Sequence, residues 1–359
     1  MSGRGPRRIA VVMLSRGLGG LEQSFLDYVA ALDHRGWSIL AVHHPAWPRA
    51  AELAGLGVDR TGIASLGEWD PLAARRLRRV LEHDATAVIT IGRRATTLVR
   101  RALEGRAGPA QLAVTPNYSF KGLIGLPMVI ATTRDIRAAL IRAGQPDDRI
   151  SVVPNLIRMP QTRPERPVPF PPVPTIGALG RFVAKKGFAD LLDALSQLGD
   201  RPFRLVLAGD GPEAAALRAE VARLGLDDRV DLPGWLDDPT ALLARLDLLV
   251  VPSHHEPFGI VVLEGMAHGL PVIVTDAEGP REIVQGGVDG LVVPRHDPPA
   301  LARAIGRLLD DPPLAARLAA AGRATVEARY DLPVVAAEIE AVVDRTLDAS
   351  TAAPSSRAR

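Results

Sequence analysis

Two glutamates stand eight positions apart in a segment that reads SHHEPFGIVVLEGMAHGLPVIV, from Ser253 to Val274. Glu256 precedes a Phe-Gly turn, and Glu264 follows it. Short apolar runs flank the pair on both sides, which predicts a buried strand, a loop, a helix and a second buried strand. Carboxylates accept hydrogen bonds from hydroxyl groups, so a polyhydroxylated ligand such as a ribose or a sugar fits this pattern.

The predicted helix begins near Gly259, because Pro257 suits an entry turn and Gly259 allows a ligand close to the backbone. A helix that starts beyond the carboxyl end of a parallel strand presents free N–H groups and a positive dipole end, which favour a phosphate. The alternative for any such pair is a surface helix with two solvated glutamates. The residues around this pair favour the ligand site.

The same segment resembles the E-x7-E motif of retaining GT-B glycosyltransferases of family 4, or group 1, which include bacterial lipopolysaccharide-core and mannosyl transferases. EPFG, the second glutamate, the small-residue helix GMAHG and LPVIVTD follow in the family's order. The resemblance implies that Glu256 contacts the hydroxyls of the donor sugar and Glu264 the ribose. It also implies that Gly259 and Ile260, next to Phe258, offer backbone N–H groups to the donor diphosphate.

A basic loop follows the predicted strand from Thr175 to Leu179. Arg181 and Lys186 stand five positions apart in it, and two cations after one strand match the charge of a diphosphate. A basic loop without a ligand is the alternative. GRF followed by KKG resembles the family's G-R-x4-K-G element, which implies that Gly180 lines the site. By the same resemblance Arg181, Lys186 and Glu256 are the expected catalytic residues.

Two further turns follow predicted strands in the second half. Gly209 and Gly211 belong to AGDGP, which resembles the family's G-x-G-P turn beside the nucleotide, with a plain strand-to-helix turn as an equal alternative. Trp235 and Leu236 follow Gly234 and resemble the loop that receives the base through backbone groups. A tryptophan at this position could also serve packing alone.

The first half carries the expected acceptor side. The loop SRGLGGLE resembles the glycine-rich loop of the family's amino-terminal domain, which implies that Gly19 and Gly20 lie next to the donor phosphate and the acceptor. Asn117 and Tyr118 are expected acceptor contacts, with a buried amide and a core tyrosine as the alternatives.

The sequence departs from the family at two positions of this half. Pro116 replaces the histidine of the H-N-Y motif, and Pro127 replaces the aspartate of D-x-V-I. No role of that histidine therefore carries over to this chain.

Nicotinamide and metal chemistry are not expected. The G-x-G-x-x-G fingerprint is incomplete, because Glu22 occupies its last position and would repel a pyrophosphate. His254 and His255 are neighbours, and neighbours on an extended segment point to opposite sides, which disfavours joint metal binding. No Asp-x-Asp element follows a strand in the first half, and the GT-B resemblance implies catalysis with no metal and no other cofactor.

The composition of the chain limits its domain number, its partners and its localisation. The 359 residues suffice for two domains of roughly 150 to 170 residues each. The net charge of +2 does not call for a nucleic-acid partner, and the lack of cysteine excludes disulfides and thiolate sites. No apolar run reaches the roughly 20 residues that span a bilayer, so a cytoplasmic protein is expected. Most arginines of the clusters in the first half are expected to lie on solvated helix faces, and contact with an anionic membrane surface or an acidic acceptor is the alternative.

Short β-rich runs alternate with helical patterns along the chain, which predicts an α/β fold of two doubly wound Rossmann-like domains facing a cleft, as in GT-B proteins. The expected parts are an acceptor-side domain at 1–158, a proline-rich linker at 159–174 and a nucleotide-sugar-binding domain at 175–331. A helix is expected at 332–347, and the resemblance implies that it packs on the first domain. A disordered tail is expected at 348–359. The expected strands are Ile9–Leu14, Ile39–His43, Ala87–Ile91, Leu112–Thr115, Val129–Thr132, Ile150–Val153, Thr175–Leu179, Arg204–Ala208, Val230–Leu232, Leu248–Val251, Val272–Val274 and Leu291–Val293.

These expectations converge on a retaining glycosyltransferase that moves a sugar from a nucleotide-sugar to a hydroxyl of a glycan or glycolipid. UDP is the expected nucleotide, and cell-envelope polysaccharide or lipopolysaccharide the expected product. A nucleotide-sugar hydrolase or epimerase on the same fold is the alternative among enzymes. A catalytically inactive protein that only binds the nucleotide-sugar is the alternative outside them.

Overall fold

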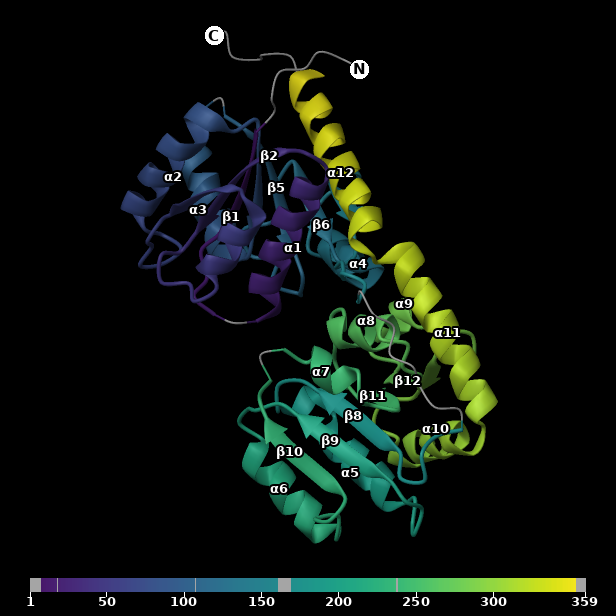
Figure 1. The fold of residues 1–359 in the computed structure, drawn as a ribbon. Coiled ribbons are helices and arrows are strands. Elements are labelled where there is room, and N and C mark those ends of the chain that lie inside the picture. The colour runs from purple at the N-terminus through teal and green to yellow at the C-terminus, as the bar shows by residue number, and fades with distance from the viewer. Residues whose placement is uncertain (1–7, 18, 107, 161–168, 237, 353–359) are drawn as a thin grey trace. The chain divides into compact units, whose positions relative to one another are not determined.

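The structure is a computed structural model that describes residues 8–17, 19–106, 108–160, 169–236 and 238–352. The chain divides into two compact units (Figure 1). Unit 1 comprises residues 1–156 and 332–359, and unit 2 comprises residues 157–331. Among the described residues, no helix combines the length and the apolar character needed to span a membrane.

Unit 1 is built on a seven-stranded sheet in the order β3-β2-β1-β4-β5-β6-β7, and every neighbouring pair is parallel. Its strands are β1 (Arg8–Met13), β2 (Ser38–His43), β3 (Asp59–Gly62), β4 (Ala87–Ile91), β5 (Ala110–Thr115), β6 (Met128–Ala131) and β7 (Ile150–Val152). Its helices are α1 (Gly20–His34), η1 (Ala50–Leu56), α2 (Pro71–Asp84), α3 (Arg93–Leu103), α4 (Arg134–Arg142), η2 (Asp147–Arg149) and α12 (Leu332–Ala352).

Both faces of this sheet are buried, as parallel sheets require. Val11 and Met13 on β1 pack with α1 and α12, whereas Ala10 and Val12 pack with α2 and α3. Helix α12 is fixed to this unit by polar contacts as well, since Glu340 accepts hydrogen bonds from Arg35 and from the indole of Trp37. The last helix of the chain thus belongs to the unit formed by its first half.

Unit 2 repeats the design with a six-stranded parallel sheet in the order β10-β9-β8-β11-β12-β13. Its strands are β8 (Thr175–Leu179), β9 (Arg204–Ala208), β10 (Val230–Gly234), β11 (Leu248–Val251), β12 (Val272–Thr275) and β13 (Leu291–Val293). Its helices are η3 (Ala184–Lys186), α5 (Phe188–Ser196), α6 (Ala214–Arg223), α7 (Thr240–Leu243), α8 (Ile260–Ala267), α9 (Pro280–Ile283), α10 (Pro298–Asp310) and α11 (Pro312–Arg329).

Strand β11 shows why the apolar runs are so regular. Leu248 and Val250 face the core that contains α5 and α10, and Leu249 and Val251 face the core that contains α8. Every residue of the strand is therefore buried, which explains an unbroken apolar run instead of an alternating one. The predicted α/β class with two doubly wound parallel sheets is confirmed.

The larger differences from the expectations are one edge strand and one helix end. Strand β3 was not predicted, because this edge strand reads Asp-Arg-Thr-Gly and buries none of its residues fully. Helix α12 continues to Ala352, so residues 348–352 are helical and not a tail, since no proline or glycine interrupts them before Pro354. The rest of the expected tail and residues 161–168 of the expected linker lie outside the described residues.

Candidate functional site

The candidate donor site lies at the carboxyl edge of the unit 2 sheet. The sheet order reverses between β8 and β11, and ligands of open α/β sheets bind beyond the carboxyl ends of strands at such a switch point. The loop after β8 carries Arg181 and Lys186, and the loop after β11 carries Glu256. The fold thus brings the loops of two separate motifs to one switch point.

Lys186 and Glu256 form an ion pair, Nζ to Oε2, with side chains that are 19% and 13% exposed. Arg181 is exposed, and no described residue pairs with its guanidinium. Lys185 is exposed as well, while its carbonyl accepts the N–H groups of His254 and His255. The two loops are therefore joined by backbone bonds and by one ion pair, and Arg181 is left available to a ligand.

Glu264 lies on α8 and is half-buried. Burial, followed by repulsion from Asp238, raises the pKa of Glu264 to about 7. No described side chain donates a hydrogen bond to its carboxylate. A half-buried acceptor without a donor is costly in the free protein, and hydroxyls of a ligand could satisfy it.

The start of α8 offers hydrogen-bond donors. Gly259 is the N-cap residue of α8, and its φ of 101° is a left-handed conformation that favours glycine. No side chain at the N-cap position therefore accepts a hydrogen bond from the first N–H groups of the helix. The first N–H groups of a helix have no acceptor within it, so those around Ile260 can bind an anion. Phe258, just before them, is buried and stacks edge-on against Tyr330 at 6.3 Å between ring centroids.

Gly209 and Gly211 have a structural reason to be glycine. Their turn packs backbone against backbone on the loop after β8: a Cβ at Gly209 would lie 1.9 Å from the carbonyl oxygen of Gly180, and one at Gly211 would lie 2.4 Å from that of Phe182. The N–H of Phe182 also donates to the carbonyl of Asp210 at 2.8 Å. The turn therefore supports the loop that carries Arg181.

Trp235 and Leu236 follow β10 at the same edge of the sheet. The Trp235 side chain is 54% exposed, whereas Leu236 packs against the core that contains α8. An exposed indole next to the carboxyl edge does not serve core packing, so it is available to a planar ligand.

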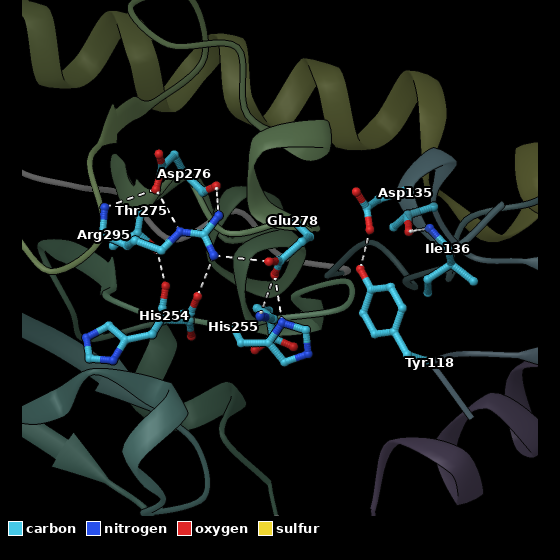
Figure 2. A network of polar contacts seen from close by, with 12 residues as sticks. Tyr118, Asp135, Ile136, His254, His255, Thr275, Asp276, Glu278 and Arg295 are labelled. Atoms are coloured by element: carbon cyan, nitrogen blue, oxygen red, sulfur yellow. Dashed lines mark hydrogen bonds and ion pairs between the residues drawn. The ribbon is translucent and has the colours of Figure 1, made fainter. Parts of the chain in front are cut away.

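An ionic network that was not predicted from the sequence holds the loop around Glu256 (Figure 2). Arg295 donates to Asp276, to Glu278 Oε1 at 3.0 Å and to the carbonyl oxygen of His254 at 2.7 Å. Glu278 Oε2 in turn accepts the N–H of Glu256 at 3.3 Å. Burial raises the pKa of Glu278, but hydrogen bonds from backbone N–H groups and Arg295 outweigh it, and the pKa is lowered.

Residues after β12 and β13 thus fix the position of the loop after β11. The signal available in the sequence was the pair of polar runs TDAEGPRE and PRHD directly after two predicted strands, whose carboxyl ends meet at one edge.

A group able to hold a metal ion adjoins this network. His254 Nε2 lies 2.8 Å from Asp190 Oδ2, and the rings of His254 and His296 are 3.7 Å apart. One possible ligand atom from each of the three residues lies within 4.8 Å of the others. His255 turns instead to Glu278, at 3.0 Å, so the adjacent histidines do not share a site.

In unit 1, Gly19 and Gly20 are exposed at the start of α1, beyond β1. The N–H of Gly19 donates to Glu22 Oε2 at 2.8 Å, and Ser15 Oγ donates to the other carboxylate oxygen. Glu22 is buried, so the acid that breaks the dinucleotide fingerprint serves to cap this loop.

Asn117 and Tyr118 follow β5 in unit 1. The Tyr118 hydroxyl donates to Asp135 Oδ2 at 2.6 Å (Figure 2), and the Asn117 side chain accepts the N–H of Ser119 at 3.0 Å. Asn117 is exposed and Tyr118 is half-buried. Both have partners within the unit, which orient them at its carboxyl edge.

Comparison with known proteins identifies the family. A family model described as Glycosyl transferases group 1 matches residues 164–325. The chain is 32% identical over 322 residues to the lipopolysaccharide core biosynthesis glycosyltransferase LpsD of Rhizobium meliloti, covering 87% of this chain and 91% of that protein. It is 40% identical over 157 residues to LpsE of the same organism, covering 44% of this chain and 46% of that protein.

The crystal structure of Anabaena Alr3699/HepE in complex with UDP and glucose has the same fold. It matches with a TM-score of 0.82 at 23% sequence identity, over 94% of this chain and 100% of that chain. The GT-B fold and the identity to LpsD over most of both proteins lead to one conclusion: this chain belongs to the group 1 family of glycosyltransferases.

Proposed function

We propose that this glycosyltransferase transfers a sugar from a UDP-sugar to a hydroxyl of a cell-envelope glycan or glycolipid, with retention at the anomeric carbon. The names of LpsD and LpsE support a lipopolysaccharide-core acceptor, and the HepE complex supports UDP as the nucleotide. The observation that carries the proposal is the meeting of two basic residues, two glutamates and a free helix start at one edge of unit 2.

In this proposal unit 2 holds the donor. Glu264 accepts hydrogen bonds from the ribose, and Trp235 and Leu236 line the base. Arg181 and the first N–H groups of α8 bind the diphosphate. Gly180, Gly209 and Gly211 shape the loop that supports Arg181.

Catalysis rests on stabilising the charge of the leaving diphosphate. The acceptor hydroxyl oxygen bonds to the anomeric carbon as the bond from that carbon to the diphosphate oxygen breaks. The hydroxyl proton passes to a donor phosphate oxygen on the same face, so the reaction needs no protein nucleophile. Lys186 shares its charge with the diphosphate, while Glu256 binds the sugar hydroxyls. No metal takes part in these steps.

Thermal stability against a panel of nucleotides and nucleotide-sugars tests the donor assignment. We expect UDP and its sugars to raise the melting temperature, and both Glu264→Ala and Lys186→Ala to abolish the rise. Release of free sugar without any acceptor would favour a hydrolase, and tight binding without turnover would favour an inactive binding protein. Pro116 and Pro127, where the family has histidine and aspartate, are the two departures that support the inactive alternative.

Peripheral contact with a membrane is part of the proposal. Leu66 and Trp69, which precede α2, are 93% and 63% exposed, and Leu72 in its first turn is 64% exposed, an unusual density of large apolar side chains on a surface. Arg75 and Arg76 are exposed one helical turn further on. Apolar side chains beside arginines suit an anionic lipid surface, near which a glycolipid acceptor would reside.

A further inference from the structure

Unit 1 has a switch point of its own, and a cavity lies at it. The sheet order reverses between β1 and β4, so the loops after these two strands separate beyond their carboxyl ends. A cavity of about 290 Å³ opens there, lined by residues 14–16 after β1 and 91–95 at the end of β4 and the start of α3, together with Leu21. Its size approaches the lower end of small-molecule sites.

The lining is strongly basic. Arg16, Arg93 and Arg94 contribute to it, and none of the described residues that line it is acidic. Arg93 is neutralised by Glu68, at 2.8 Å. Arg94 donates only to the carbonyl oxygen of Leu14, at 3.1 Å, and no described carboxylate pairs with Arg94 or Arg16. Two guanidinium charges therefore remain uncompensated at the cavity.

The charges around this cavity are consistent with a positive potential. Burial and then the charges of Arg16 and Arg94 lower the pKa of the neighbouring His44. The acid closest along the chain, Glu22, is buried and already accepts hydrogen bonds from Ser15 and Gly19. Both of its carboxylate oxygens thus have donors within the loop, and among the described residues no hydrogen bond or ion pair joins Glu22 to Arg16 or Arg94.

We propose that this cavity binds an anionic group, a phosphate or a carboxylate, of the acceptor. The assignment to the acceptor rests on the proposed function; the anion site itself rests on the cavity and its two unpaired arginines. Arg16 and Arg94 would each supply charge-assisted hydrogen bonds to the anion. The acceptor would then be a phosphorylated or carboxylated saccharide, or a lipid-linked one with its phosphate in the cavity.

The test is a titration of the full-length protein with inorganic phosphate, glucuronate and glucose at constant ionic strength, followed by thermal stability. An Arg181→Gln background weakens the competing phosphate site of unit 2. We expect phosphate or glucuronate, but not glucose, to stabilise this protein. Adding Arg16→Gln or Arg94→Gln should weaken that effect about tenfold or more, because each removes a hydrogen bond to a charged group.

Arg142→Gln is the matched control, since it removes one exposed arginine of unit 1 that does not line the cavity and should leave the titration unchanged. Anion binding that is equal in all variants, or absent at concentrations of tens of millimolar, would overturn the site. Glucuronate binding with no response to phosphate would assign a carboxylate, and the reverse a phosphate.

The two proposals fail in different ways. UDP binding to unit 2 should be unaffected by Arg16→Gln and Arg94→Gln, so absence of UDP binding in the wild-type protein would refute the proposed donor while leaving the anion titration valid. If UDP binds and the anion site is present, both variants should lower kcat/KM for an anionic acceptor. An unchanged kcat/KM would show that the anion bound in the cavity is not part of the acceptor.

Discussion

Lys186 and Glu256, which stand 70 positions apart in the sequence, form an ion pair at the switch point of unit 2. The cation proposed to meet the diphosphate is thus held, in the free protein, by the carboxylate proposed to meet the sugar. Each side chain holds the other in position before the donor arrives.

Lys186→Ala should therefore reduce both stability and donor binding. It leaves Glu256 half-buried without its cation, which should cost about 1–3 kcal/mol of unfolding free energy. A double-mutant cycle with Glu256→Ala, measured by denaturant unfolding, should recover part of this loss. Lys185→Ala, at the exposed neighbour, is the control and should change neither quantity. Additive effects of the two substitutions would contradict the coupling.

Glu264→Gln should change stability and affinity in opposite directions. The pKa of about 7 in the folded chain lies above the ordinary 4.5, so the free energy of unfolding falls as pH rises from about 4.5 to 7 and then levels off. Replacing the acid by a neutral amide should remove this decline and stabilise the free protein at pH 8 by up to about 3 kcal/mol. At pH 4 the two proteins should be similar.

The same substitution should weaken UDP binding about tenfold, because an amide accepts ribose hydrogen bonds less strongly than a carboxylate. Melting temperatures at pH 5 and pH 8, with and without UDP, measure both effects. A glutamine variant that is less stable than the wild type at pH 8 would show that Glu264 has a structural role instead.

Arg295→Lys should loosen the loop around Glu256 although it keeps the positive charge. Lysine cannot reproduce the planar fork that reaches Asp276, Glu278 and the carbonyl of His254 together. Hydrogen exchange should increase at residues 254–259 and stay constant in β9, which serves as an internal control. Equal exchange in both segments would mean that the network does not hold the loop.

Trp69→Ser with Leu66→Ser should reduce binding to vesicles that contain anionic lipid. Two apolar groups that enter the interface are lost, so cosedimentation should fall at least tenfold. Val288→Ser removes an exposed apolar side chain of unit 2, 46% exposed, and should bind vesicles as the wild type does. If the wild-type protein does not bind the vesicles, the proposed membrane contact is wrong.

A chelator should leave UDP binding and transfer unchanged, because no metal takes part in the proposed mechanism. Loss of transfer in EDTA, restored by one divalent ion, would contradict this. His296→Gly then identifies the metal site: it removes one of the three possible ligands and relieves a residue that has φ 58°. A restored activity that is lost in this variant would assign the ion to Asp190, His254 and His296.

Much of the fold could be predicted because parallel strands buried on both faces read as unbroken apolar runs. Thr175–Leu179, Arg204–Ala208 and Leu248–Val251 were predicted to the residue for this reason. Strand β3 was missed because an exposed edge strand needs no apolar side chains. Helix α12 extends further than predicted because a surface turn of small polar residues has no pattern that separates it from a tail.

The residues of the candidate site could be named from motifs, but not their interactions. Neither the Lys186–Glu256 pair nor the contact of Arg295 with Glu278 has any local signal, since the partners belong to different strands' loops. The same holds for Arg16 and Arg94, which pair with no described carboxylate, whereas the neighbouring Arg93 pairs with Glu68. Pairing is decided by distances across loops, which sequence spacing does not determine.

The proton on Glu264 has a thermodynamic consequence for any nucleotide that binds there. With a pKa of about 7, the free site carries about half a proton at neutral pH. If the ribose binds only the ionised carboxylate, binding releases this fraction of a proton to the buffer. The measured heat of binding will therefore differ between phosphate buffer and Tris buffer in proportion to the ionisation enthalpies of the two buffers. The donor site would then sense acidification, with affinity falling as pH drops below 7.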